Sequence, residues 1–155
     1  MSVSSYSQQL LVAVSRLEDY GLVNTIISNS ETRPSGELFI NIKVELIDNS
    51  VLFIREYVSS RQEHIEHFSY AYQYQAADES LIFRYDNAPH KPALAEKEHK
   101  HLQNVEIILC PLPSIESTIE EILSWLTVDN RSLFTQNNIS TQILEPQPWE
   151  RTKVL

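Results

Sequence analysis

The stretch from residue 37 to 47, ELFINIKVELI, constrains the fold more than any other part of the sequence. Apolar side chains recur at every second position, while Asn41, Lys43 and Glu45 fill alternate positions. A period of two places successive side chains on opposite faces of a β-strand, so one face is apolar and the other polar. The turn residues Asp48-Asn49-Ser50 follow, and SVLFIREYV then resumes the alternation. The two runs predict an antiparallel β-hairpin.

Further strands and two helices are predicted on either side of this hairpin. Strands are expected in residues 22–33, 64–75 and 81–86 and in the short apolar run at 105–110, and amphipathic helices in residues 6–20 and 114–126. Gly21 is placed to end the first helix. The sequence therefore predicts an α+β fold, with a curved antiparallel sheet flanked by an N-terminal and a C-terminal helix. The sheet is a meander of about five strands plus one more. We expect both helices to cover its apolar face, which leaves the other face for function.

Length and composition narrow the class of protein. A chain of 155 residues fits one core, so we expect a single domain over residues 1–128 and a polar extension over 129–155, packed on the surface or partly mobile. With no long apolar run, no signal-like start and a single cysteine, we expect a cytoplasmic protein that does not engage a membrane. The net charge of −9 argues against a broad footprint on duplex nucleic acid. Two glycines leave no material for a phosphate-binding loop.

The residues that can carry chemistry gather between Leu81 and Leu102, in LIFRYDNAPHKPALAEKEHKHL. Three of the five histidines of the chain lie there, together with Arg84 and Asp86. Period two puts Arg84 and Asp86 on one strand face, either as a solvated pair or turned together toward a ligand. Two imidazoles beside a cation are what phosphodiester cleavage by internal 2′-OH attack requires, without a metal ion.

These observations predict a metal-independent ribonuclease that needs no cofactor. His90 and either His99 or His101 are expected to exchange protons, while Arg84 and Lys100 hold phosphate and Asp86 orients a histidine or Arg84. The candidate substrate-binding residues are Lys100, Lys91, Asn87 and Tyr72. The file of tyrosines at positions 70, 72 and 74 is able to stack bases of single-stranded RNA, or to form a core stripe instead.

Three other interpretations remain open. The pair His99 and His101, with His90, offers imidazoles to a metal ion, although no CxxC or HExxH motif supports a zinc site. The histidines are equally compatible with a surface loop that has no chemical task. Finally, the chain is compatible with a non-enzymatic interaction module that docks a protein through its aromatic strand and acidic surface.

Three segments between about Tyr70 and Leu102, YAYQYQ, LIFRYDNAPH and HKHL, resemble the motifs of the TumE-type toxin family of prokaryotic type II toxin–antitoxin systems. The resemblance implies a cytosolic toxin that acts on RNA and is neutralised by a cognate helix-turn-helix antitoxin. By position it makes the candidate site Arg84, Asp86, Asn87, His90, His99, Lys100 and His101. The chain departs from the family at Gln73, where histidine is usual, and at Lys91 and Lys97-Glu98 in the loop. A free strand edge would also allow a symmetric homodimer.

Overall fold

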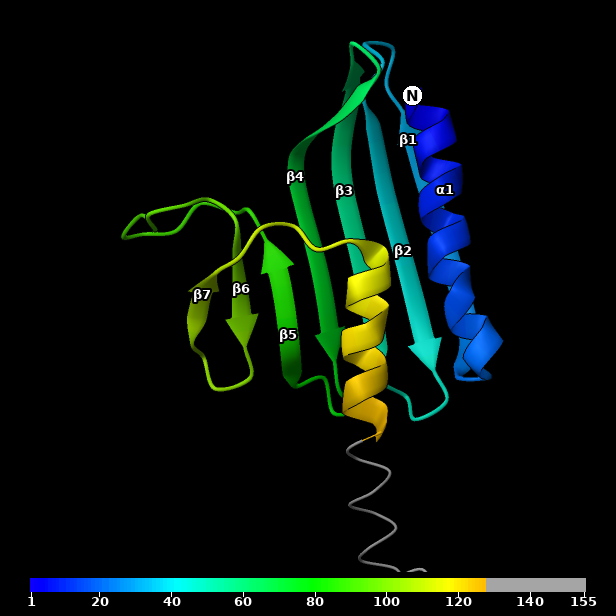
Figure 1. The fold of residues 1–155 in the computed structure, drawn as a ribbon, viewed down its shortest axis with the longest axis vertical. Coiled ribbons are helices and arrows are strands. Elements are labelled where there is room, and N and C mark those ends of the chain that lie inside the picture. Colours follow the sequence, from blue (N-terminus) through cyan, green and yellow to red (C-terminus); the bar gives the residue numbers. More distant parts are fainter. Residues whose placement is uncertain (128–155) are drawn as a thin grey trace, which may run out of the picture. The chain divides into compact units, whose positions relative to one another are not determined.

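The computed structural model describes residues 1–127 (Figure 1). The chain divides into two compact units, Met1–Glu116 and a second unit that starts at Ser117, and each is described by itself. The expected extension over residues 129–155 lies outside the described residues, so its arrangement and the boundary at residue 128 stay predictions.

The first unit opens with helix α1 (Val3–Ser15), which continues as the 3-10 turn η1 (Arg16–Tyr20). Ser2 caps the helix, since its hydroxyl oxygen accepts a hydrogen bond of 3.1 Å from the backbone N–H of Ser5. Gly21 ends the turn with φ of 67°, a left-handed conformation that costs glycine little. The predicted stop at Gly21 is therefore confirmed.

A single antiparallel sheet follows, in which each strand pairs with the next along the chain (Figure 1). The strands are β1 (Val23–Thr32), β2 (Leu38–Leu46), β3 (Val51–Arg61), β4 (His64–Gln75), β5 (Leu81–Asp86), β6 (His99–Leu102) and β7 (Ile107–Leu109). The α+β prediction and the predicted hairpin of β2 with β3 are confirmed. Among residues 1–127 the sheet has seven strands rather than about six. The strand that the sequence analysis did not predict is β6. Its sequence, HKHL, has no apolar alternation, and only its pairing with β5 identifies it as a strand.

The two faces of this sheet differ in character. On the apolar face the buried side chains of β2 and β3, including Ile42 and Ile54, continue into the tyrosine file of β4 and into Phe83 and Tyr85 of β5. Helix α1 packs on this face, where the hydroxyl of Tyr6 donates a hydrogen bond of 2.7 Å to buried Glu56.

The opposite face of the sheet is called the polar face here. In register across it lie Asn41, Arg55, Ala71, Asp86 and His99 in one row and Phe53, Gln73, Arg84 and His101 in the next. The polar face therefore carries the residues that the sequence analysis selected on β5, together with two histidines of β6.

A second helix covers residues 115–127, close to the predicted 114–126. Its apolar residues recur at helical spacing, as Ile115, Ile119, Ile122 and Leu126. That this helix covers the apolar face of the sheet stays a prediction. Within residues 1–127, every helix is too short or too polar to cross a bilayer.

Candidate functional site

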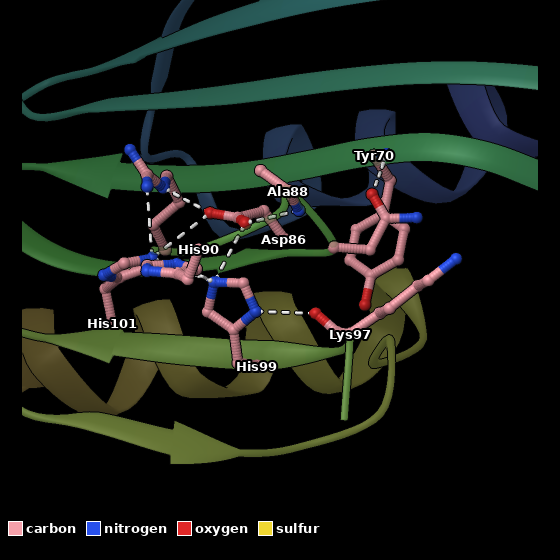
Figure 2. Close-up of polar contacts among 9 residues, drawn as sticks. Tyr70, Asp86, Ala88, His90, Lys97, His99 and His101 are labelled. Atoms are coloured by element: carbon pink, nitrogen blue, oxygen red, sulfur yellow. Dashed lines mark hydrogen bonds and ion pairs between the residues drawn. The ribbon is translucent and has the colours of Figure 1, made fainter. Parts of the chain in front are cut away.

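Four side chains converge where β5 ends and β6 begins: Asp86, His90, His99 and His101 (Figure 2). We call these four residues the histidine cluster. One nitrogen or oxygen atom from each lies within 4.8 Å of the others. The antiparallel register produces this convergence, because Asp86 pairs with His99 and Arg84 pairs with His101 on the neighbouring strand. His90 is added from the loop over residues 87–98.

Asp86 lies at the centre of the cluster and is 2% exposed. Its Oδ2 accepts a hydrogen bond of 2.6 Å from Arg84 Nε and its Oδ1 accepts one of 2.9 Å from the backbone N–H of Ala88. His99 Nε2 lies 3.0 Å from Oδ1, and His101 Nε2 lies 3.4 Å from Oδ2. A buried carboxylate needs partners of this kind to remain charged. Asp86 therefore fixes Arg84 and two of the rings relative to one another.

His99 is completely buried, and a backbone carbonyl determines that its Nδ1 carries a hydrogen. Its Nδ1 lies 2.7 Å from the carbonyl oxygen of Lys97, which can only accept, so Nδ1 donates (Figure 2). The other nitrogen, Nε2, points into the cluster, 2.8 Å from His90 Nε2 and 3.1 Å from His101 Nε2. Both nitrogens of His99 are thus engaged inside the protein.

His90 and His101 are the partly exposed rings, with centroids 5.2 Å apart. Arg84 Nη2 lies 3.1 Å from His101 Nε2, and a guanidinium only donates, so His101 Nε2 accepts there. Burial, and then the charge of Arg84, lowers the pKa of His101 from its ordinary value of 6.5. The nearby His99 and His90 act in the same direction, while Asp86 opposes them. The shift favours the neutral imidazole of His101 at neutral pH.

Two residues predicted to bind substrate lie on the other face of the sheet. Lys100 stands between His99 and His101 on β6, so period two turns it to the apolar face, where its ammonium lies 4.7 Å from the ring centroid of Tyr85. Tyr72 is 2% exposed, and its hydroxyl donates to Glu56 in the core. Neither position fits a contact with a substrate bound at the histidine cluster.

The two remaining candidates, Asn87 and Lys91, belong to the loop. The Asn87 side chain accepts from the backbone N–H of Tyr70 at 3.0 Å and donates to the carbonyl of Phe68 at 3.3 Å, so it serves the backbone of β4. Lys91 is exposed one residue after His90. The loop also encloses an open pocket of about 650 Å³ whose lining includes His90, which gives a ligand access to that ring.

Sequence reasoning missed Arg55, which lies on the polar face one strand beyond β4. Two shallow hollows, of about 300 and 330 Å³, are both lined by Arg55 and Ala71. The small side chain of Ala71, in register with Asp86, leaves this space open. Gln73 lines the second hollow and pairs with Arg84. The alternation of β3 indicated that Arg55 faces the polar side, but no motif marked it.

The comparisons with known proteins point to a family. The family model described as toxin TumE matches residues 13–132, which is most of the chain and includes the whole histidine cluster. No curated protein and no solved structure matches the sequence. The chain therefore belongs to the TumE toxin family, the toxin side of a toxin–antitoxin pair.

Proposed function

We propose that this toxin acts as a ribonuclease, which cleaves RNA by internal attack of a 2′-hydroxyl at the histidine cluster. The observation that carries the proposal is the pairing of two accessible imidazoles with a cation. His90 and His101 are partly exposed with ring centroids 5.2 Å apart, and the guanidinium of Arg84 lies 3.1 Å from His101. Such an arrangement supplies a base, an acid and a charge that stabilises the transition state.

In the proposed reaction, His101 Nε2 takes the proton of the 2′-hydroxyl while the 2′ oxygen bonds to phosphorus. The bond from phosphorus to the 5′ oxygen breaks, and protonated His90 gives its proton to that oxygen. His101 is assigned the role of base rather than His99, because the ring of His101 is partly exposed whereas His99 is completely buried. The products are a 2′,3′-cyclic phosphate and a 5′-hydroxyl, and no metal ion takes part.

Arg84 is the proposed phosphate contact, and Asp86 and His99 are positioning residues. A guanidinium presents several donors in one plane, which suits the equatorial oxygens of a pentavalent phosphate. The side chain of Arg84 is 36% exposed and is anchored by Asp86 through Nε, which leaves Nη2 directed at His101. An incoming phosphate would replace this contact with His101.

The chemistry of the products tests the function. Incubation of the purified protein with single-stranded RNA in the presence of EDTA is expected to give fragments that end in 2′,3′-cyclic phosphate and begin with 5′-hydroxyl. In cells, expression should arrest growth, and coexpression of the cognate antitoxin should relieve the arrest. Intact RNA after incubation with a preparation that arrests growth would reject the ribonuclease proposal.

Arg84→Gln is expected to lower the rate of RNA cleavage at least about tenfold, because the phosphate loses its charged partner. The matched control is Arg61→Gln, which removes the same charge from an exposed position at the end of β3, in a weak 4.0 Å ion pair. Cleavage of a labelled RNA by both variants measures the difference. Equal rates for the two variants would remove Arg84 from the proposed mechanism.

For partners, we propose a cognate antitoxin of the helix-turn-helix type, as the family resemblance implies, and the cytoplasm as the compartment. The exposure of the edge strand β7 supports the proposal of a protein partner. Its residues Ile107, Ile108 and Leu109 are 36%, 39% and 52% exposed. An apolar strand edge is a ready template for pairing. The alternative is a homodimer in which two copies pair along this edge. Light scattering of the purified chain measures its molar mass and so distinguishes a dimer from a monomer.

A further inference from the structure

We infer that the histidine cluster binds one zinc-class divalent ion, and that the bound ion switches off the proposed ribonuclease. The assignment of the site stands on the geometry of Asp86, His90, His99 and His101 alone. The inhibitory effect rests on the proposed function.

The donor set favours zinc over the hard cations. Three imidazole nitrogens and one carboxylate oxygen are ligands that Zn²⁺ accepts, whereas Mg²⁺ and Ca²⁺ prefer oxygen ligands throughout. Bonds of about 2.0–2.1 Å give a tetrahedron whose edge is roughly 3.3 Å. His99 Nε2 lies 2.8 Å from His90 Nε2, 3.0 Å from Asp86 Oδ1 and 3.1 Å from His101 Nε2, and one atom from each of the four residues lies within 4.8 Å of the others. Binding would draw together the ligand atoms that lie farthest apart, which are separated by up to 4.8 Å.

The direction of the lone pairs supports a cation at the centre of the cluster. Because His99 Nδ1 carries the hydrogen that bonds to the Lys97 carbonyl, the lone pair of neutral His99 lies on Nε2 and faces Asp86 Oδ1 at 3.0 Å. Two acceptors at this separation repel unless a proton or a metal ion lies between them. A backbone carbonyl that holds the far nitrogen of a ligating histidine is the usual support of a metal site.

Three of the four ligands are already held in place. Asp86 and His99 are 2% and 0% exposed, and Asp86 is anchored by Arg84 and by the backbone of Ala88. His101 projects from the same face of β6 as His99, and only His90 comes from a loop. Binding therefore requires adjustment of one loop residue rather than construction of the site.

An ion bound here would block the proposed proton transfers. His101 Nε2 would give its lone pair to the metal, so its contact with Arg84, now 3.1 Å, would open. His90 Nε2 would be occupied in the same way, and neither ring would be able to exchange a proton with RNA. A chelator that removes the ion would restore the ability of both rings to exchange protons.

Calorimetric titration of the full chain with Zn²⁺ alone tests the site. One ion per chain is expected to bind, and His90→Ala and His101→Ala should each weaken the affinity at least about tenfold. The control is His64→Ala, which removes an exposed imidazole at the start of β4 and should bind as the wild type does. Circular dichroism confirms that each variant is folded. Absence of binding by the wild type, or equal losses in His64→Ala and His90→Ala, overturns the site.

Cleavage of RNA during a Zn²⁺ titration tests the regulation. Activity should fall with a midpoint that matches the calorimetric affinity and should return when EDTA is added. Binding without any change in cleavage overturns the regulation and leaves the site standing. Cleavage that requires Zn²⁺ overturns the regulation and the metal-independent mechanism together. A chain that binds Zn²⁺ but never cleaves RNA confirms the site and rejects the ribonuclease proposal and the regulation built on it.

Discussion

His101→Ala and His90→Ala are each expected to slow RNA cleavage by about 10²–10⁴-fold, the range for loss of one proton-transfer group. His101 is the proposed base and His90 the proposed acid, and the two rings are the accessible members of the histidine cluster. Single-turnover cleavage of an end-labelled RNA measures the loss without interference from product release. The double variant should lose less than the product of the two single losses, because both groups act in one step.

Two further measurements separate a chemical role from a structural one. Added imidazole is expected to restore part of the activity of His101→Ala, since a small ring can enter the space that the side chain leaves. His64→Ala, outside the cluster, should cleave at the wild-type rate. If His101→Ala and His90→Ala cleave RNA as fast as His64→Ala, the assignment of acid and base does not hold.

Glu56→Ala is expected to lower the free energy of unfolding by about 3 kcal/mol. Glu56 is 3% exposed and accepts hydrogen bonds from the hydroxyls of Tyr6 on α1 and Tyr72 on β4. Burial, and then the charge of Glu56, raises the pKa of both tyrosines, so both keep the proton that they donate. The substitution leaves the buried hydroxyl of Tyr72 without its acceptor and releases the contact between α1 and β3. Urea unfolding measures the change.

Glu66→Ala provides the comparison for Glu56→Ala. Glu66 carries the same charge on β4, but its only described ion pair is the 4.0 Å contact with Arg61, and half of its side chain is exposed. Its loss should alter stability by no more than about 0.5 kcal/mol. Similar midpoints for the two variants would mean that the buried carboxylate does not hold α1 on the sheet.

The sequence predicted those parts of the fold that burial alone determines. The alternation in residues 37–47 is unambiguous because each inward side chain of β2 is 0–3% exposed. The end of the helix at Gly21 was also predictable, but from local backbone chemistry. The chain there adopts a left-handed φ, which costs glycine little. Local chemistry and burial therefore agree over the first half of the chain.

Strand β6 was not predicted, because only its pairing with neighbouring strands identifies it as a strand. HKHL has one apolar residue and is a strand only through its register with β5 and β7. The sequence analysis likewise assigned no face to Lys100, which the strand places opposite His99 and His101. Tyr72 was ambiguous for another reason. Alternation groups the tyrosines of β4 on one face, but only the complete sheet decides that this face is the core.

The convergence of the histidine cluster was likewise beyond the sequence. Motif resemblance grouped Arg84, Asp86 and the three histidines, but the distances between them follow from the pairing of Asp86 with His99 across two strands. The sequence also gave no sign that His99 is buried or that the carbonyl of Lys97 fixes its ring.

Residues of the histidine cluster hold both ends of the loop over residues 87–98 by hydrogen bonds. Asp86 holds the backbone of Ala88 at one end, and at the other His99 holds the carbonyl of Lys97 while the N–H of Cys110 bonds to Glu98 at 3.2 Å. The middle of the loop contributes most of the pocket lining and makes none of these hydrogen bonds. Substitutions in the middle of this loop are therefore expected to reshape the pocket beside His90 while Asp86 and His99 keep their positions.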